Sequence, residues 1–465
     1  MENRPFDFYF GFAGKQLPGI NGLTGNECNF FTASDPSKGK ECVQEGRANY
    51  VCEHGSRMSF NIYDSDIFGV GVWNGTGPPY PNVSEFGTGY LEMNRGNTEV
   101  MWQMSPQQIP VKMALAQEFA VFDDWHAAFP GPSTPNHLFL QTATSAGCTE
   151  TGSTYKCKPG GLFPQKTIYE SLTEQNHTWA YFYNDSCWNS FMHFFHTPEG
   201  QAGLRGYDEF YHRAAQGTLP SFSWVLPRQG HNKTTGQGSN DDHPCHDIAL
   251  GERLLKDTYE AVRASPKWNE TVMIVTYDDP GGWYDHAGVP VNVPAPDNET
   301  SCPDDTDFTW MGARVPTLLI SPWVEKGRVI HKPDGPFPDS VYEHSSIPAS
   351  LKDIFGLPNF LTKRDAWAGS FLSELTLSSP RKDTIEHTPE APPPAAPGRG
   401  LHCSAKTKTC SDLDYPNKKQ RQRMRQWAMV HDIAVPDFDE YSQAQADDWI
   451  QEQFLSFRAK MLATN

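Results

Sequence analysis

The segment Thr276–His286, with the sequence TYDDPGGWYDH, places acidic and histidine side chains directly after an apolar run. Asp278 and Asp279 are adjacent carboxylates, which repel each other at close range unless a cation joins them. Oxygen ligands of this kind suit Mg²⁺, Ca²⁺ or Mn²⁺, and His286 extends the choice to Zn²⁺ or Fe. The alternative is a solvated acidic turn, because Asp, Pro and Gly are ordinary loop residues.

Two further polar clusters precede expected helices. Residues 240–247 read NDDHPCHD, and helix capping accounts for one or two of these positions but not for all of them. The two histidines and three aspartates in these eight residues stay candidates for a site. Glu343 and His344 form the second cluster, where a serine N-cap just after them is the structural alternative.

The candidate nucleophile lies in residues 129–137, FPGPSTPNH. Three prolines and a glycine predict a rigid, exposed loop that presents Ser133, with Thr134 as a second hydroxyl. A hydroxyl becomes a good nucleophile only when a base or a metal lowers its pKa. A proline-rich turn without chemistry is the alternative. The chain has neither a G-x-S-x-G elbow nor a C-x-P-x-R motif, which argues against an α/β-hydrolase and a sulfatase.

The elements that must position these residues follow an α/β pattern. Helical periodicity marks residues 164–175, 246–265 and 345–355, and apolar or aromatic runs predict strands at 178–183, 272–277 and 314–320. Their alternation predicts an α/β layered fold. The run 272–277 is typical of a strand buried on both faces of a parallel sheet, beyond whose carboxyl end ligands bind.

Composition limits the partners of this 465-residue chain. Its formal net charge of −18 repels polyanions, and no basic stripe of useful size is present, so nucleic-acid binding is excluded. No apolar run approaches the roughly 20 residues that cross a bilayer, so no transmembrane segment is expected.

Cysteines and glycosylation sequons indicate the secretory route. The ten cysteines form an even set without a C-x-x-C pair. Seven Asn-x-Ser/Thr sequons lie at Asn74, Asn82, Asn176, Asn184, Asn232, Asn269 and Asn298. Together they favour a secreted glycoprotein with disulfides over a cytosolic protein with free thiols, although the opening MENRPFDF carries no signal segment.

The chain is expected to have three parts. Residues 1–385 form the main domain, residues 386–402 a proline-rich linker and residues 403–465 an extension with a helix. One face of that helix is apolar, formed by Ile450, Phe454, Phe457 and Met461. Docking on the chain's own main domain is the first interpretation, and contact with a partner or a peripheral membrane surface is the second.

Several of these segments resemble the phosphoesterase family, and most closely the plant non-specific phospholipases C. The opening MENRPFD resembles the family's ENRSFDH, and most of residues 1–370 shares the likeness. The other motifs that carry it are GINGLTGNECNFFTASDP, EFAVFDDW, NDDHP, TYDDPGGWYDH, VPTLLISPWVEKG, EHSSIPASLKDIFGLP and LTKRDAWAG. The resemblance implies an alkaline-phosphatase-like three-layer α/β/α fold with a mainly parallel central sheet.

The resemblance also implies roles for individual residues. The metal ligands would be Glu2, Asn3, Asp278 and Asp279, which would hold a divalent cation. Ser133 would be the nucleophile, with Thr134 as the fallback. His243, His286 and His344 would line the phosphate pocket and supply an acid. Asn136, Asp242 and Glu343 would bind substrate.

The implied activity is a metal-dependent phosphoester hydrolase of phospholipase C type. It would cleave glycerophospholipids to diacylglycerol and a phosphorylated headgroup through a phospho-serine intermediate. An acid phosphatase acting on phosphomonoesters and a catalytically dead binding glycoprotein are the alternatives. The chain departs from the family in three ways: it lacks the strand that precedes MENR, it has TYDDPGG where plant enzymes have TYDEHGG, and it has Ser where they have Thr.

Overall fold

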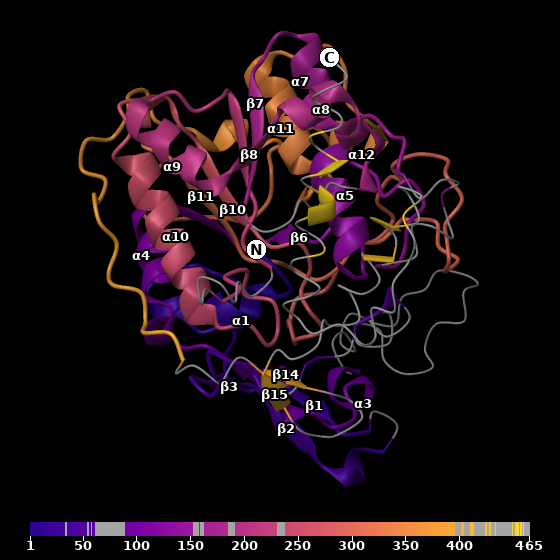
Figure 1. The fold of residues 1–465 in the computed structure, drawn as a ribbon. Helices are drawn as coiled ribbons and strands as arrows, with labels where there is room; N and C mark the ends of the chain where they lie inside the picture. The colour runs from indigo at the N-terminus through magenta and orange to yellow at the C-terminus, as the bar shows by residue number, and fades with distance from the viewer. Residues whose placement is uncertain are drawn as a thin grey trace.

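The computed structural model describes residues 1–395 apart from 33–34, 54, 57, 61–88, 152–157, 159–161, 185–190 and 230–237, together with 401–403, 410–412 and scattered positions between 424 and 459. Two sheets form the centre, and helices lie on both sides of them (Figure 1). The expected three-layer α/β/α arrangement is therefore confirmed.

A four-stranded sheet has the order β10-β11-β5-β12, formed by Met273–Thr276, Thr317–Ile320, Ala120–Phe122 and Arg328–Ile330. β11 is antiparallel to both neighbours, whereas β12 is parallel to β5. The expectation that residues 272–277 form a parallel strand buried on both faces is wrong. β10 is an edge strand of this sheet, pairs antiparallel with β11 and is only partly buried.

The second sheet is entirely parallel. Its order is β8-β7-β9, formed by Leu204–Gly206, Trp179–Tyr183 and Phe222–Val225. A short parallel pair joins β6 to β13, Trp125–His126 and Tyr342–Glu343. The remaining pairs are β1-β2 (Cys28–Phe30, Lys40–Cys42), β3-β4 (Gln44–Glu45, Trp102–Gln103) and β14-β15 (Leu401–Cys403, Cys410–Asp412).

The helices form the two outer layers (Figure 1). One layer contains α4, α9 and α10, which span Pro110–Glu118, Tyr207–Gln216 and Ile248–Arg263. The other contains α5, α7, α11 and α12, which span Ser133–Thr142, Ile168–Glu174, Ser346–Phe355 and Lys363–Trp367. The shorter α-helices are α1 (Phe6–Phe10), α3 (Tyr90–Met93) and α8 (Pro198–Ala202). Short 3-10 turns lie at Ala13–Lys15, Pro36–Lys38, Thr98–Met101, Pro106–Gln108, His193–His196, Trp268–Glu270 and Phe371–Glu374.

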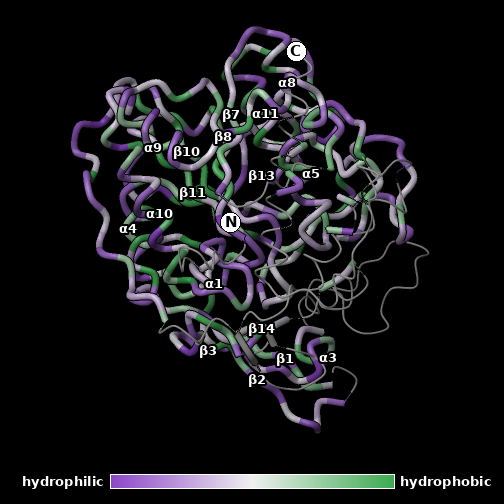
Figure 2. Tube along the Cα trace, viewed as in Figure 1, coloured by the Kyte–Doolittle hydropathy of each residue, from purple (hydrophilic) through white to green (hydrophobic). Residues whose placement is uncertain are grey.

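Local sequence explains where these elements begin. The Asp247 carboxylate accepts a hydrogen bond from the Ala249 N–H and caps α10, whose Leu255, Tyr259 and Val262 repeat at helical spacing and are buried. A capping box starts α7. Apolar residues accordingly concentrate along the central strands, β10 and β11 among them (Figure 2).

The segment after the main fold runs along α10. Lys256, Tyr259 and Arg263 of α10 donate hydrogen bonds to the backbone carbonyls of Thr388, Ile385 and Thr384, respectively. The first residues of the proline-rich stretch therefore lie against the main fold. We call residues 384–395 the strap.

The carboxy-terminal segment contacts the main fold at a few described positions. Phe454 is buried and its ring meets that of Tyr183, while Trp427 contacts His196. Of the predicted helix face, Phe457 also contacts His196, whereas Ile450 and Met461 lie outside the described residues.

Two disulfides join described cysteines, Cys28 to Cys42 and Cys52 to Cys245. Cys302 is also disulfide-bonded, and Cys148 is a buried free thiol. Within the described residues, no helix is both long and apolar enough to cross a bilayer.

Candidate active site

The amino-terminal residues lie beside the end of β10. The Met1 amino group donates to the Thr276 carbonyl at 3.1 Å, and the Asp278 N–H donates to the Met1 carbonyl at 3.1 Å. The Glu2 N–H donates to the Asp241 carbonyl at 2.7 Å. These backbone bonds bring the first three residues to the carboxyl end of β10, where the sequence places the aspartates.

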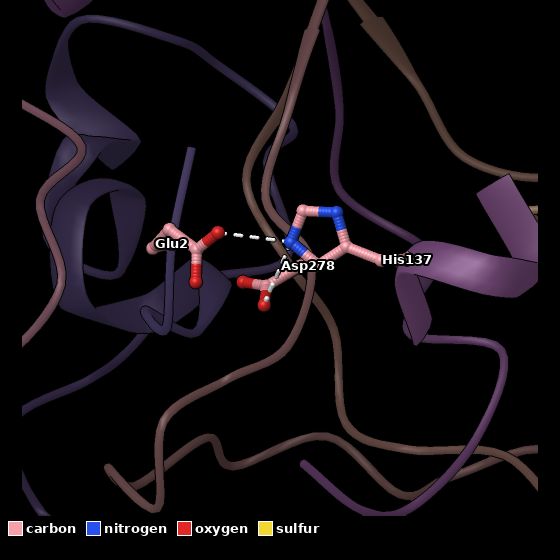
Figure 3. A group of neighbouring side chains, drawn as sticks. All are labelled: Glu2, His137 and Asp278. Atoms are coloured by element: carbon pink, nitrogen blue, oxygen red, sulfur yellow. Dashed lines mark hydrogen bonds and ion pairs between the residues drawn. The ribbon is translucent and has the colours of Figure 1, made fainter. Parts of the chain in front are cut away.

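Glu2, His137 and Asp278 meet there from three distant parts of the chain (Figure 3). His137 Nε2 lies 2.9 Å from Glu2 Oε1 and 3.5 Å from Asp278 Oδ2. All three side chains are buried. Their donor atoms lie within 4.8 Å of one another, close enough to ligate a single cation.

The charges of these three side chains are linked. Burial, followed by the Asp278 charge, raises the pKa of Glu2. Burial alone would lower the pKa of His137, but the Glu2 carboxylate outweighs it and the pKa is raised. Burial opposes ionisation of Asp278 too, yet the hydrogen bond and charge of His137 hold its pKa below the usual range. The site therefore gathers negative charge around one imidazole.

Asn3 connects this group to the candidate nucleophile. Its backbone N–H donates to Asp278 Oδ1 at 2.8 Å, and its side-chain amide donates to Asp279 Oδ1 at 2.9 Å. The Ser133 hydroxyl donates to Asn3 Oδ1 at 3.4 Å. Ser133 is the first residue of α5, and His137 follows one helical turn later on the same face.

A glycine turn permits this close approach. Gly281 has a φ of +68°, and a Cβ atom on it would lie 2.0 Å from the Asn3 carbonyl oxygen. Its N–H donates to Asp279 Oδ1 at 2.8 Å. The chain can therefore turn directly behind Asp279 without pushing Asn3 away.

Three of the site residues predicted from the sequence make their hydrogen bonds outside the group of Glu2, His137 and Asp278. The Asn136 amide donates to three backbone carbonyls of residues 129–132, so it holds the loop before Ser133. Asp242 accepts hydrogen bonds from Tyr9 and Tyr277 and pairs with Lys112 at 3.1 Å. Glu343 accepts from the Ser345 N–H at 2.8 Å, and burial raises its pKa to about 7.

The three predicted histidines lie in different places. His286 Nδ1 lies 2.7 Å from Asp7 Oδ2, beside a buried ion pair between Asp7 and Arg314. His344 Nε2 donates to the Asp278 carbonyl, and burial lowers its pKa to about 4, so the ring is neutral and braces the Asp278 backbone. His243 lies beside His246, with ring centroids 5.4 Å apart.

Four residues at the site were not among the site residues predicted from the sequence. These are His137, Gln229, Asp241 and His246. The Gln229 amide donates to Glu2 Oε1 at 2.6 Å, and His246 Nδ1 lies 2.6 Å from Asp241 Oδ1. His137 lies four positions after Ser133 in the expected nucleophile segment, and Asp241 and His246 lie in the polar cluster 240–247, so only Gln229 had no signal in the sequence.

The donor set fits a divalent cation. Asp278 Oδ2 is buried, and among the described residues it pairs with His137 Nε2 at 3.5 Å, a distance that leaves the buried carboxylate weakly compensated. Carboxylates, one imidazole and an amide oxygen together are ligands for Mg²⁺, Mn²⁺, Zn²⁺ or Fe²⁺.

Known proteins share these segments. The Phosphoesterase family profile matches residues 1–358. The chain is 39% identical to non-specific phospholipase C6 of Arabidopsis thaliana over 84% of this chain and 74% of that protein. It is 40% identical to non-specific phospholipase C1 of the same plant, over 84% and 72%. A solved protein of the alkaline phosphatase superfamily from Vibrio parahaemolyticus matches with a TM-score of 0.34 and 12% identity, covering 76% of this chain and 83% of that one.

The extent of these matches settles the class of reaction. The profile spans the site and most of the main fold, and relatives near 40% identity are covered over more than two thirds of their length. The protein is a hydrolase of phosphoric ester bonds, and it belongs to the Phosphoesterase family.

Proposed function

We propose that this protein is a secreted phospholipase C. It would cleave glycerophospholipids to diacylglycerol and a phosphorylated headgroup. The observation that carries the proposal is the Ser133 hydroxyl contacting Asn3, which in turn bonds to both Asp278 and Asp279. The names of the Arabidopsis relatives support the diester substrate.

The proposed metal ligands are Glu2, Asp278 and Asp279, with the Asn3 amide oxygen and His137 completing the set. A divalent cation bound there supplies positive charge to phosphoryl oxygens and lowers the pKa of a nearby hydroxyl. The geometry of the Asp278 carboxylate supports this assignment because one oxygen binds the Asn3 N–H, while the other lies with the ligand atoms of Glu2 and His137 within 4.8 Å of one another.

Ser133 is the proposed nucleophile. It begins a ten-residue helix, and the partial positive charge at a helix N-terminus favours a phosphate group. In the first step Ser133 Oγ forms a bond to phosphorus, its proton passes to solvent, and the bond from phosphorus to the diacylglycerol oxygen breaks. In the second step water attacks phosphorus, the phosphorylated headgroup leaves and the Ser133 hydroxyl is restored.

The leaving oxygen of diacylglycerol needs a proton, and we assign His246 to supply it. Burial alone would lower the pKa of His246, but the Asp241 carboxylate outweighs it and the pKa is raised. The Glu2 charge also raises the pKa of His246, so the two groups are within electrostatic reach. His344 is a poor acid because it is neutral and already bonded to the Asp278 carbonyl.

The test compares p-nitrophenylphosphorylcholine with p-nitrophenyl phosphate, with and without chelator, followed by product analysis on phosphatidylcholine vesicles. Chelator-sensitive diester cleavage with diacylglycerol release is the expected result. Preference for the monoester would replace the proposal with an acid phosphatase. Inactivity on both esters, from folded protein supplied with metal, would replace it with a binding glycoprotein.

Substitutions at two neighbouring hydroxyls test the nucleophile. Ser133→Ala should lower kcat by more than about 1,000-fold, because the covalent step is lost. Ser133→Thr should keep measurable turnover. Thr134→Ala is the matched control on the next residue and should behave like the wild type. Full activity in Ser133→Ala would show that another group attacks phosphorus.

Secretion and glycosylation belong to the same proposal. Asn176, Asn269 and Asn298 are exposed in the structure and available to a glycan, and two disulfides join described cysteines. Production in a secretory host followed by glycosidase digestion should reveal a loss of mass. An unmodified protein from that host would contradict glycosylation.

A further inference from the structure

The structure contains a small cavity that the proposed mechanism does not use. Arg4, Phe8, Glu99, Trp102 and Trp283 line it, and it is partly open to solvent. Arg4 directly follows Asn3, and Trp283 follows the Gly281 turn. The cavity therefore lies behind the two segments that carry the proposed metal ligands.

The Arg4 guanidinium is buried in this cavity, and two of its nitrogens have no acceptor among the described residues. Arg4 is 1% exposed, and its Cζ lies 4.4 and 4.5 Å from the ring centroids of Phe8 and Trp283, two rings that are nearly perpendicular to each other. Nε donates to the Asp242 carbonyl at 3.1 Å, whereas Nη1 and Nη2 have no hydrogen-bond partner within the part of the chain that the structure describes. Such a buried charged donor is costly unless something accepts from it.

A second donor lines the same cavity. The indole Nε1 of Trp102 is buried and has no hydrogen-bond acceptor among the described residues. The described polar atoms that line this cavity without a partner are thus donors, and those of Arg4 carry a positive charge. A ligand that satisfies them must offer acceptor atoms and negative charge.

We propose that the cavity behind the metal ligands binds a small oxyanion, with Arg4 donating two hydrogen bonds and Trp102 a third. Phosphate, sulfate and a carboxylate share this chemistry. The planar guanidinium suits two oxygens of one such group, and its contacts with two aromatic rings, together with the Nε bond to the Asp242 carbonyl, hold it in place.

One acidic group opposes this ligand. Glu99 lines the cavity and is 6% exposed, and its charge contributes to raising the pKa of Arg4 against the larger effect of burial, which lowers it. Its negative charge repels any oxyanion bound in the cavity. Removing that repulsion with Glu99→Gln should therefore increase the affinity of the cavity for an oxyanion.

The experiment measures binding of sulfate, phosphate, acetate and phosphocholine by titration calorimetry at constant ionic strength. It uses the full chain with Ser133→Ala and with chelator present, so that binding at the catalytic group is suppressed. Saturable binding of sulfate and phosphate is expected. If phosphocholine binds with equal affinity, the bound oxyanion can be the phosphate of a lipid headgroup. If only the free ions bind, the site is specific for free oxyanions.

Four variants assign the binding to the cavity. Arg4→Met should weaken binding by about tenfold or more, since it removes two charge-assisted hydrogen bonds. Trp102→Phe should weaken it by about threefold, and Glu99→Gln should strengthen it. Arg47→Met is the matched control, because Arg47 is exposed and its guanidinium lies 4.3 Å from the Trp102 ring centroid without lining the cavity.

The four variants keep the experiment decisive even if one of them does not fold. If Arg4→Met fails to fold, Trp102→Phe and Glu99→Gln still decide the outcome through opposite shifts. Absence of saturable binding in the parent protein, or equal affinity in Arg4→Met and Arg47→Met, would overturn the proposal. Because binding requires no turnover, failure of the phospholipase assignment leaves this result intact.

Discussion

Ser133 and His137 illustrate what a sequence reveals about single residues. The type and position of Ser133, Asp278 and Asp279 suggested chemistry, and the structure brings these residues to one place. The histidines were harder, because a side chain's partner depends on the fold. His286 is held by Asp7, 279 positions earlier in the chain, and no local pattern reveals that pairing.

Glu343 should give the protein a measurable pH dependence. Burial raises its pKa from 4.5 to about 7, so its contribution to stability is complete below pH 4.5 and is lost as the pH rises through 7. At pH 8 the buried carboxylate should lower the free energy of unfolding by about 3 kcal/mol relative to its neutral form, and Glu343→Gln should remove this loss. Urea unfolding at pH 5 and pH 8 measures this difference.

The control for this experiment is Glu270→Gln. Glu270 is 66% exposed and pairs with Lys267 on the surface. Its substitution should shift the free energy of unfolding by less than about 0.5 kcal/mol at either pH. Parallel pH profiles for the wild type and Glu343→Gln would contradict the assignment.

At the scale of elements, the periodicity of apolar residues predicted several of the helices and strands around the site. Helices α7, α10 and α11 and strands β7, β10 and β11 lie where the patterns predicted them. Strand direction could not be read, since an apolar run is equally compatible with parallel and antiparallel neighbours. The nucleophile loop was expected to be exposed, whereas Ser133 is buried at the start of α5.

The Gly281 turn is an element whose role can be tested by adding one methyl group. Gly281→Ala combines a left-handed backbone with a Cβ 2.0 Å from the Asn3 carbonyl oxygen. We expect a loss of at least about 2 kcal/mol in the free energy of unfolding, together with reduced hydrolysis because Asn3 is displaced. Urea unfolding and the diester assay provide the two measurements.

Gly14→Ala is the comparison for this change. A Cβ on Gly14 meets nothing within 4 Å, so the same added methyl group should leave both stability and hydrolysis near wild-type values. Equal stability of the two alanine variants would show that the turn tolerates a side chain.

At the scale of the whole molecule, two disulfides differ in the length of chain that they close. Cys52–Cys245 spans 193 positions and Cys28–Cys42 spans 14. Chain entropy predicts stabilisation of about 5 kcal/mol for the first and about 3 kcal/mol for the second. Paired alanine substitutions at each bridge, followed by urea unfolding, should show that order.

The longer disulfide also lies next to the proposed acid. Cys245 immediately precedes His246, so its loss should lower diester hydrolysis even at temperatures where the protein remains folded. Removal of Cys28–Cys42 should not, because that bridge closes a local hairpin between β1 and β2. Equal activity losses in the two paired variants would argue against His246.

The strap has a consequence for how this protein can change over evolutionary time. Three α10 side chains recognise it through carbonyl oxygens, which every amino acid carries. Substitutions at the exposed Glu386 and His387 therefore leave these bonds available, whereas substitutions at Lys256, Tyr259 or Arg263 remove them. Orthologues that keep this packing should vary at those two exposed strap positions, while the buried Thr384 and Thr388 and the row on α10 remain constrained.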